Sequence, residues 1–568
     1  MHIRLTTACF VALQSALCVA AAAQGAPAQG NSRYDTALAR YKECLARKPF
    51  VHHTEGRSEL AKTRTAEALQ ILAEDYARKQ EYSEYTRYTL ATLFGRHFDQ
   101  EEALASLVAL RNANTKPVDT WLWFQTLRIE IDRVGETGAV SMARGDKNML
   151  MRAAAIAALG ASKKGTLKDA IVAVCLDFPK QEADRNLLIG AMSGALFAQK
   201  KRVNEPEYRE ALTAYISLLA EPVGLTHTAK LQMARHLQWI LNGPALFMNP
   251  EPWLELMARG EVKKPADGGT TAAARFFGIE SDGERICYVV DMSDSMLKEI
   301  SPDARPSGPV TGQKPKKKRE LLDESDLPWL KIRTRWDLAR EQLRISLLRL
   351  PPDKHFSVVW FGDGAETLNA TKGLVKATKA NVDRAIAELD SINAADPPTT
   401  QTDGHPVKTG KVLKGDTNLH GGLCRAFGLA GKGYKDTAVF VDPEALTDGC
   451  DTIFLLSDGA PTVDNFMLLD KDYNEGPVVD DIEAGTPAPR TPQIWYPGPF
   501  VQEEWLVEDL RRMNAFRGIR VHTIGLGEAN MRLLQQLAEV GHGETFAFGR
   551  QKNAAAKREP EGGAPGRK

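Results

Sequence analysis

The sequence predicts an α/β protein in which an all-α N-terminal domain, residues 31–260, precedes a doubly wound, mostly parallel sheet flanked by helices. The chain of 568 residues is too long for one hydrophobic core. Between residues 31 and 260, apolar residues recur at steps of three and four, the period of an amphipathic helix. After a boundary rich in Gly, Pro and small polar residues, 261–275, short continuous apolar runs alternate with helical patterns, which is typical of parallel strands buried on both faces.

The helical half contains a segment that resembles a HEAT-type helical hairpin. Residues 146–178 form two amphipathic segments joined by a Gly/Ser/Lys turn, and residues 185–222 and 226–256 are candidate degenerate copies. Such hairpins stack into a solenoid because one hairpin alone cannot bury its apolar face. An irregular helical bundle is the alternative for this half.

Strands and helices alternate through the second half. The run Ile286–Val290 predicts a buried strand, and "HFSVVWFG", "TIFLLSDG", "IRVHTIGLG" and "ETFAF" predict further strands, with "AETLNA" as an edge strand. Helical patterns lie between them, for example in "TNLHGGLCRAFGLA", "QEEWLVEDLRRMNAF" and "NMRLLQQLAEV". This alternation predicts right-handed crossovers. The tail, 551–568, has the composition of a disordered segment.

Three polar clusters follow strands or precede a helix in this half. They are Asp291 with Ser293 and Ser295, then Thr417, then Asp458. Ligands of open α/β sheets bind beyond the carboxyl ends of the strands, where the first and third clusters must lie. Hydroxyl and carboxylate oxygens without His or Cys suit a hard divalent cation, and Mg²⁺ best. The sequence therefore predicts a metal site at this edge of the sheet.

The motifs "DMSDSM", "GDTN" and "LLSDG", in this order, resemble the metal-ion-dependent adhesion site of a von Willebrand factor A domain. The flanking stretches "RFFGIESDGERICYVVD" and "IRVHTIGLGEANMRLLQQLAEVGHGETF" are similar to the usual beginning and end of that family. The resemblance spans roughly Phe276 to Phe548, so residues 276–550 are expected to form the domain.

The resemblance implies a role for each polar side chain. Ser293 and Ser295 would coordinate the metal directly, Thr417 directly or through water, and Asp291 and Asp458 largely through waters. A carboxylate of a partner protein typically fills the remaining position in this family. One departure is Asp294, where many relatives have Gly; it would tighten metal binding, admit Ca²⁺ or Mn²⁺, or point to solvent. The alternatives are that all these residues are turn formers and helix caps, or that the fold no longer holds metal.

Three inserts near the ligand clusters, 298–331, 391–414 and 462–501, are long for such a domain. Long loops in a compact domain are usually functional or disordered. We expect the inserts to form a rim around the ion that restricts which carboxylate reaches it, with disorder as the alternative. The aromatic residues of the third insert argue against disorder there.

The N-terminus predicts export. Residues 1–23 have a short basic start, an apolar stretch and a small-residue end, the layout of a secretory signal, so the mature protein is expected in the periplasm, on the cell surface or in the medium. No later segment predicts a transmembrane span. Five cysteines follow the signal, with no CxxC motif and no spacing typical of Cys/His metal sites. The formal net charge of zero gives no reason to expect a nucleic-acid partner.

These observations favour an exported protein-interaction or adhesion module that binds an acidic group of a partner through Mg²⁺, Mn²⁺ or Ca²⁺. A scaffold of a cell-envelope complex, with the helical domain as the main binder, is the second hypothesis. A metal-dependent hydrolase is the third, because His405 and His420 lie near the predicted metal edge. Hydroxyl-bound Mg²⁺ activates water poorly, however, and the sequence contains no catalytic motif, so we do not expect an enzyme.

Overall fold

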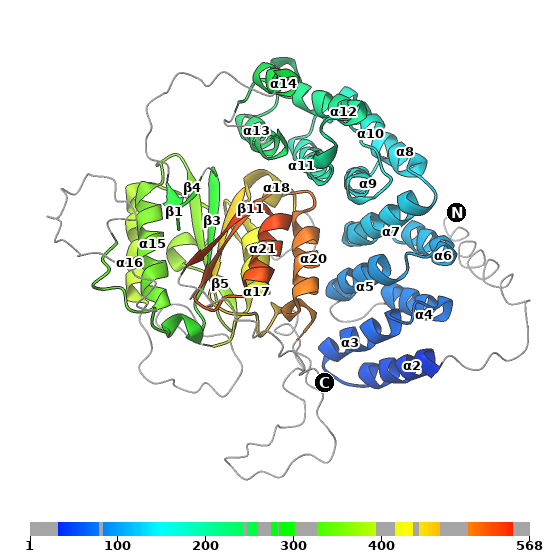
Figure 1. Cartoon of the computed structure of the whole chain (residues 1–568), viewed down its shortest axis with the longest axis horizontal. Coiled ribbons are helices and arrows are strands. Elements are labelled where there is room, and N and C mark those ends of the chain that lie inside the picture. Colours follow the sequence, from blue (N-terminus) through cyan, green and yellow to red (C-terminus); the bar gives the residue numbers. More distant parts are fainter. Residues whose placement is uncertain are drawn as a thin grey trace, which may run out of the picture.

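Two bodies of secondary structure make up the computed structural model, a curved array of helices and a sheet covered by helices on both faces (Figure 1). The structure describes residues 32–78, 83–241, 247–259, 274–281, 283–300, 327–392, 415–434, 442–465 and 498–548. The predicted signal peptide, the tail and nearly all of the predicted linker lie outside these residues. So do most of the three inserts.

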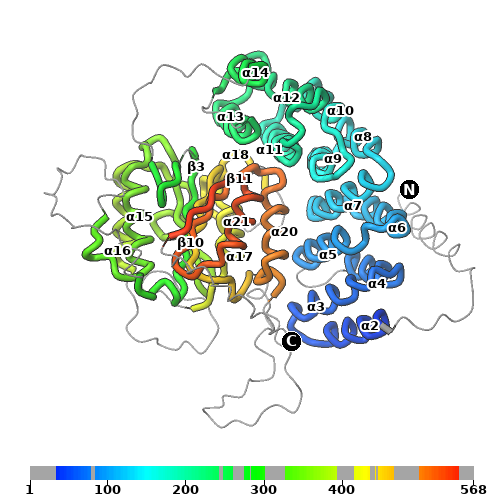
Figure 2. Tube along the Cα trace, viewed as in Figure 1, coloured from blue at the N-terminus to red at the C-terminus, as the bar shows by residue number. Residues whose placement is uncertain are grey.

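The N-terminal half is helical, as predicted. Its helices are α2 (Ser32–Leu45), α3 (Phe50–Ala61), α4 (Ala66–Ala77), α5 (Ser83–His97), α6 (Glu101–Ala113), α7 (Thr120–Arg133), α8 (Thr137–Gly145), α9 (Met149–Ala161), α10 (Lys168–Leu176), α11 (Glu182–Ala198), α12 (Pro206–Ser217), α13 (His227–Leu241) and α14 (Pro250–Arg259). Helices α3, α5, α7, α9, α11 and α13 pack successively against one another, and α8, α10, α12 and α14 do the same. The array therefore has two rows, and it curves around one side of the sheet (Figures 1 and 2). Its assignment to HEAT-type repeats stays a prediction.

The C-terminal half is built on a mostly parallel sheet of seven strands. Its strands are β3 (Arg285–Asp291), β4 (His355–Phe361), β5 (Ala365–Thr367), β6 (Val375–Lys376), β9 (Thr452–Ser457), β10 (Arg520–Leu526) and β11 (His542–Phe548), in the order β11-β10-β9-β3-β4-β5, with β6 also beside β4. Only β5 and β6 pair antiparallel, so the predicted edge strand is confirmed. The short pairs β1 (Arg275–Phe276) with β2 (Ile279–Glu280), and β7 (Leu429–Ala430) with β8 (Gly433–Tyr434), lie outside the sheet.

Helices cover both faces of this sheet because successive residues of a strand point to opposite sides. In β3, Tyr288 and Val290 join a core with α15 (Arg335–Arg349) and α16 (Lys379–Ser391). Cys287 and Val289 point the other way, into a core with α17 (Leu419–Phe427), α20 (Glu503–Asn514) and α21 (Met531–Val540). The continuous apolar run thus fills two cores, as the pattern predicted.

The second of these cores continues without a break into the helical half. Helix α11 lies so close to the turn after α20 that a Cβ on Gly190 would be 2.0 Å from the carbonyl oxygen of Phe516. From α13, Gln232 Nε2 donates to the carbonyl of Arg517 at 3.1 Å and His236 Nε2 lies 3.3 Å from the carbonyl oxygen of Gly518. The two halves therefore share one buried apolar interface with polar contacts at its edge.

None of the helices in the described part of the chain is long and apolar enough to cross a membrane. The five cysteines beyond the predicted signal are all described, and each is unpaired.

Replacement of Gly190 by alanine should destabilise the protein through this interface. The new methyl group must displace the Phe516 backbone, at a cost of about 1–3 kcal/mol, which exceeds the gain of about 1 kcal/mol in helix propensity. Gly194→Ala is the matched control in the same helix, because its nearest outside atom is 3.6 Å from the added Cβ. Thermal unfolding should give a lower Tm for Gly190→Ala only. Equal Tm values for the two variants would show that α11 is not tightly packed here.

The interface should also weaken below pH 6.5. Burial lowers the pKa of His236 to about 4, against an ordinary value of 6.5, so the folded protein favours the neutral ring. A lowered histidine pKa stabilises the fold above pH 6.5, and this contribution is lost as the pH falls towards 4. At pH 5 the loss is about 2 kcal/mol. Tm measured from pH 7.5 to 5 should fall less steeply for His236→Gln than for wild type; parallel curves would contradict the assignment.

Candidate metal centre

The site begins with two buried carboxylates at the ends of neighbouring parallel strands. Asp291 is the last residue of β3 and Asp458 directly follows β9, and both are at most 1 % exposed. Ser457 Oγ donates to Asp291 Oδ2 at 2.8 Å, and the backbone N–H of Ser293 donates to Asp291 Oδ1 at 2.9 Å. The register of β3 against β9 therefore sets the two carboxylates side by side.

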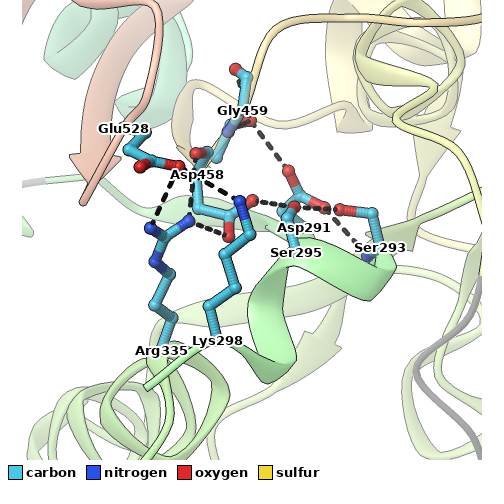
Figure 3. A network of polar contacts seen from close by, with 9 residues as sticks. Asp291, Ser293, Ser295, Lys298, Arg335, Asp458, Gly459 and Glu528 are labelled. Atoms are coloured by element: carbon cyan, nitrogen blue, oxygen red, sulfur yellow. Dashed lines mark hydrogen bonds and ion pairs between the residues drawn. The ribbon is translucent and has the colours of Figure 1, made fainter. Parts of the chain in front are cut away.

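Two serines join these carboxylates in one network: the Ser293 N–H bonds Asp291, and the two hydroxyls connect Ser293 to Asp458 (Figure 3). Ser293 precedes the short 3₁₀ helix η5 (Asp294–Leu297), and its Oγ lies 3.0 Å from Ser295 Oγ. Ser295 Oγ in turn donates to Asp458 Oδ1 at 2.5 Å. The tight turn after β3 thus folds both hydroxyls back towards the end of β9.

Thr417 comes from a third segment and reaches the same place. A Cβ built on Gly459 would lie 3.8 Å from Ser295 Oγ and 3.9 Å from Thr417 Oγ1, so both hydroxyls lie beside that glycine. The N–H of Thr417 donates to Thr462 Oγ1 at 2.8 Å, and the N–H of Thr462 donates back to the Thr417 carbonyl at 3.1 Å. Asn418 follows as the N-cap of α17 and accepts from the N–H of Gly421 at 2.7 Å. The structure brings all five predicted ligand residues together; their metal-binding role stays a prediction.

Asp294 holds the Thr417 loop to the serine turn. It is exposed, but its Oδ1 accepts from the backbone N–H of Gly415 at 3.0 Å, and its own N–H donates to the Gly415 carbonyl at 3.3 Å. Gly415 has a φ of +93°, and a Cβ there would overlap Asp363 Oδ1 at 1.8 Å. Asp294 is thus exposed to solvent and also bonded to the Thr417 loop, while its effect on metal binding stays a prediction.

The donor set fits a hard cation. Hydroxyls and carboxylates are the ligands of Mg²⁺, and the site offers them from three chain segments. Burial, followed by the nearby charge of Asp458, raises the pKa of Asp291 to about 6, because a dry site disfavours an ionised carboxylate and a second carboxylate repels it. A dication bound to these oxygens would remove that repulsion.

Arg335, the first residue of α15, was not predicted and completes the network. Its Nη1 donates to Asp458 Oδ2 at 2.8 Å, and its Nη2 lies 3.7 Å from a carboxylate oxygen of Glu528. Lys298 Nζ donates to the same Glu528 carboxylate at 3.1 Å. Figure 3 shows these cations on one side of Asp458 and the serines on the other. No sequence motif marks Arg335, because only the fold brings the start of α15 to the end of β9.

A second cluster with metal-type ligands lies between α17 and α20. His420 and Cys424 of α17 and Asp509 of α20 place one ligand atom each within 4.8 Å of one another. The sequence analysis did not single out this pair, although His420 and Cys424 are four residues apart and therefore lie on one helix face. Asp509 could be found only from the fold, because it belongs to another helix.

Hydrogen bonds already engage this second cluster. His420 Nε2 lies 3.0 Å from Asp509 Oδ2, and His420 Nδ1 accepts from the N–H of Asn465 at 3.2 Å. Burial raises the pKa of Asp509, but Arg512 and His420 lower it more strongly, so that the net shift is downward and the group is a carboxylate. A metal on Nε2 would leave a proton on Nδ1 facing the Asn465 N–H, which is unfavourable. The cluster is better explained as a structural network.

The ends of the inserts are anchored near these two clusters. Trp329 stacks on Phe548 with ring centroids 6.2 Å apart, and Phe500 stacks on His420 at 4.2 Å. The N–H of Phe500 donates to buried Asp464 at 2.8 Å. The predicted rim itself falls on residues 301–326, 393–414 and 466–497, which lie outside the described residues.

No protein-family model matches the chain, and a search of curated proteins finds no match either.

Replacement of Asp291 by asparagine should stabilise the protein when a chelator is present. The amide can accept from the Ser293 N–H and donate to Ser457 Oγ while it removes the repulsion with Asp458. The raised pKa corresponds to a gain of about 1–3 kcal/mol at pH 7.5. Thermal unfolding in excess EDTA measures the effect.

Asp451→Asn is the matched control for this change. Asp451 is also largely buried, but Arg235 and Arg285 offset the effect of burial and lower its pKa. Its carboxylate lies 3.0 Å from Arg235 Nη1. Removal of this charge should lower Tm, so the two Asp→Asn changes should have opposite signs. A lower Tm for both variants would mean that Asp291 and Asp458 do not repel.

Proposed function

We propose that the C-terminal half is a von Willebrand factor A-type domain that binds an acidic group of a partner protein through a divalent cation. The observation that carries this proposal is the convergence of oxygen donors from three separated segments at the carboxyl edge of a parallel sheet. The segments hold Ser293 and Ser295, Thr417, and Asp458, joined by the contacts described above. Ligand sites of open α/β sheets are expected at this edge.

Mg²⁺ is the cation that the donors favour, with Mn²⁺ and Ca²⁺ as alternatives. Ser293, Ser295 and Thr417 would hold it directly, and Asp291 and Asp458 would supply the negative charge beside it. The bound cation would offer a coordination position to a carboxylate of the partner. The protein's own residues orient the hydroxyls, and they do so through backbone hydrogen bonds to Asp291, Thr462 and Gly415.

Export is part of the same proposal, because residues 1–23 have the layout of a secretory signal. These residues lie outside the described structure. The partner would be an exported or surface protein with an accessible Asp or Glu. A net charge of zero gives no reason to expect a nucleic-acid partner.

A scaffold role for the helical half is the second candidate, and a specific cavity favours it. A cavity of about 860 Å³ lies between the helical array and the sheet half, with Arg96, Gln125 and Phe197 on one side and Glu508, Arg511 and Glu539 on the other. Both signs of charge line it, so its chemistry does not favour one class of ligand.

A hydrolase receives less support from the described residues. His420 is fully buried, and both ring nitrogens have partners within the fold. Its hydrogen bonds are satisfied within the core, so it is not free to act as a base on water. His405 lies outside the described residues.

Divalent metal should stabilise the protein and be required for capture of its partner. At a Mg²⁺ concentration a hundredfold above Kd, binding adds about 2–3 kcal/mol of stability, so Tm should rise by a few degrees. The full chain, immobilised and exposed to an extract of the native cell envelope and secreted proteins, should retain a set of proteins in Mg²⁺ and release it in EDTA.

Asp291→Asn should abolish both effects and remain folded. Asp383→Asn is the control, because Asp383 is an exposed carboxylate of α16 that pairs with Lys379. Calorimetry with Mg²⁺ and Mn²⁺ measures the metal directly. No metal uptake, or an identical set of captured proteins with Mg²⁺, with EDTA and with Asp291→Asn, would refute the proposal.

A further inference from the structure

We propose that Arg335 is a built-in counter-charge that weakens binding of a lone divalent cation at the strand-end site and makes tight metal binding depend on an anionic ligand. The inference rests on the proposed function, because it concerns the same site. It gives a role to a residue that neither the motifs nor the resemblance assigns.

Arg335 is aimed directly at one of the metal-site carboxylates. Its Nη1 donates to Asp458 Oδ2 at 2.8 Å, while Ser295 Oγ donates to the other oxygen, Oδ1. Both oxygens of this carboxylate are therefore engaged, one by a predicted metal ligand and one by a permanent cation. The ion pair is buried, with side-chain exposures of 9 % for Arg335 and 0 % for Asp458.

The surrounding backbone holds the guanidinium in place. Thr334 caps α15 in a capping box with Asp337, and the N–H of Arg335 donates to the carbonyl of Lys298 at 3.0 Å. Gly527, with a φ of +54°, follows β10 directly under the guanidinium; a Cβ there would lie 2.5 Å from Arg335 Nη2. A side chain larger than hydrogen at this position would push the guanidinium aside, so the backbone forms a cradle for it.

Glu528 does not cancel the charge of Arg335, because Lys298 already balances the charge of Glu528. Lys298 Nζ lies 3.1 Å from Glu528, closer than Arg335 Nη2 at 3.7 Å, and both partners of this outer pair are largely exposed. Solvent screens exposed ion pairs, so that they contribute little energy, whereas the buried Arg335–Asp458 pair is not screened in this way. The inner site therefore contains two carboxylates, Asp291 and Asp458, and one fixed cation.

The net charge of the site with a bound dication follows from these three side chains. Two carboxylates and a dication alone would be neutral, and with Arg335 the loaded site carries one net positive charge. A single carboxylate from a partner restores neutrality. Arg335 thus opposes the cation when it binds alone and favours the cation and the carboxylate when they bind together.

The experiment measures the Mn²⁺ affinity of the full chain by electron paramagnetic resonance. Mn²⁺ is added in excess acetate, which supplies a carboxylate, or in chloride of equal ionic strength, which does not. Even in water, one charge acting on a dication across about 5 Å changes affinity by on the order of tenfold. Arg335→Gln should therefore bind Mn²⁺ alone about tenfold more tightly than wild type, and acetate should improve its affinity less. Arg335→Lys keeps the charge and should resemble wild type. Arg340→Gln, on the same helix but paired with Asp337, is the matched control and should change nothing.

Each outcome of this experiment supports or overturns the counter-charge proposal, the proposed function or both. Unchanged or weaker Mn²⁺ binding by Arg335→Gln, with its fold checked by thermal unfolding, overturns the counter-charge and leaves the proposed function standing. Tighter binding by Arg335→Gln with no binding by wild type, either with Mn²⁺ alone or with acetate, supports the counter-charge and refutes the proposed function. Absence of Mn²⁺ binding in every variant refutes both. Equal gains for Arg335→Gln and Arg335→Lys would overturn the inference, because charge would not be the cause.

Discussion

Repulsion between two buried carboxylates is the constraint on which the candidate site depends. Asp291 and Asp458 end neighbouring strands whose register is set by the apolar core, so neither can move apart without disrupting β3 or β9. A buried ionised carboxylate is costly unless hydrogen bonds or opposite charges compensate it. Ser457, the Ser293 N–H and Arg335 supply part of this compensation. The remaining cost explains the raised pKa of Asp291 and gives a dication its reason to bind.

The third ligand segment links this constraint to the packing of the whole chain. Thr417 directly precedes Asn418, the N-cap of α17, so the position of its hydroxyl depends on where that helix lies. His420, the second residue of this helix, bonds Asp509 of α20, and the guanidinium of Arg512 in α20 lies 4.0 Å from the ring centroid of Tyr88 in α5. The buried His420–Asp509 network therefore fixes α17 against a helix that also contacts the N-terminal array. The interface between the halves helps to position a ligand that lies far from it in sequence.

The sequence could predict those features of the fold and the site that local residue patterns determine. Continuous apolar runs predicted the parallel strands, and the polar residues after β3 and β9 had to meet because parallel strands end at one edge. Arg335 and Asp509 could not be predicted, since each meets its partner only through the three-dimensional packing of a helix on a strand end or on another helix. Asp294 showed the same limit: its charge was visible in the sequence, but its bond to the Gly415 N–H depends on a loop 121 residues away.

The two candidate clusters differ in a way that decides between them. In the His420 cluster, both ring nitrogens have hydrogen-bond partners and Arg512 already neutralises Asp509, so a metal would have to break existing interactions. At the strand ends, Arg335 balances one of two carboxylates, which leaves a net negative charge next to three hydroxyls. Of these two clusters, only the one at the strand ends therefore keeps a net negative charge that a cation would neutralise. Under the proposed function, the same incomplete balance would account for selectivity. A guanidinium that neutralised both carboxylates would exclude the metal, and its absence would let a cation bind without any partner.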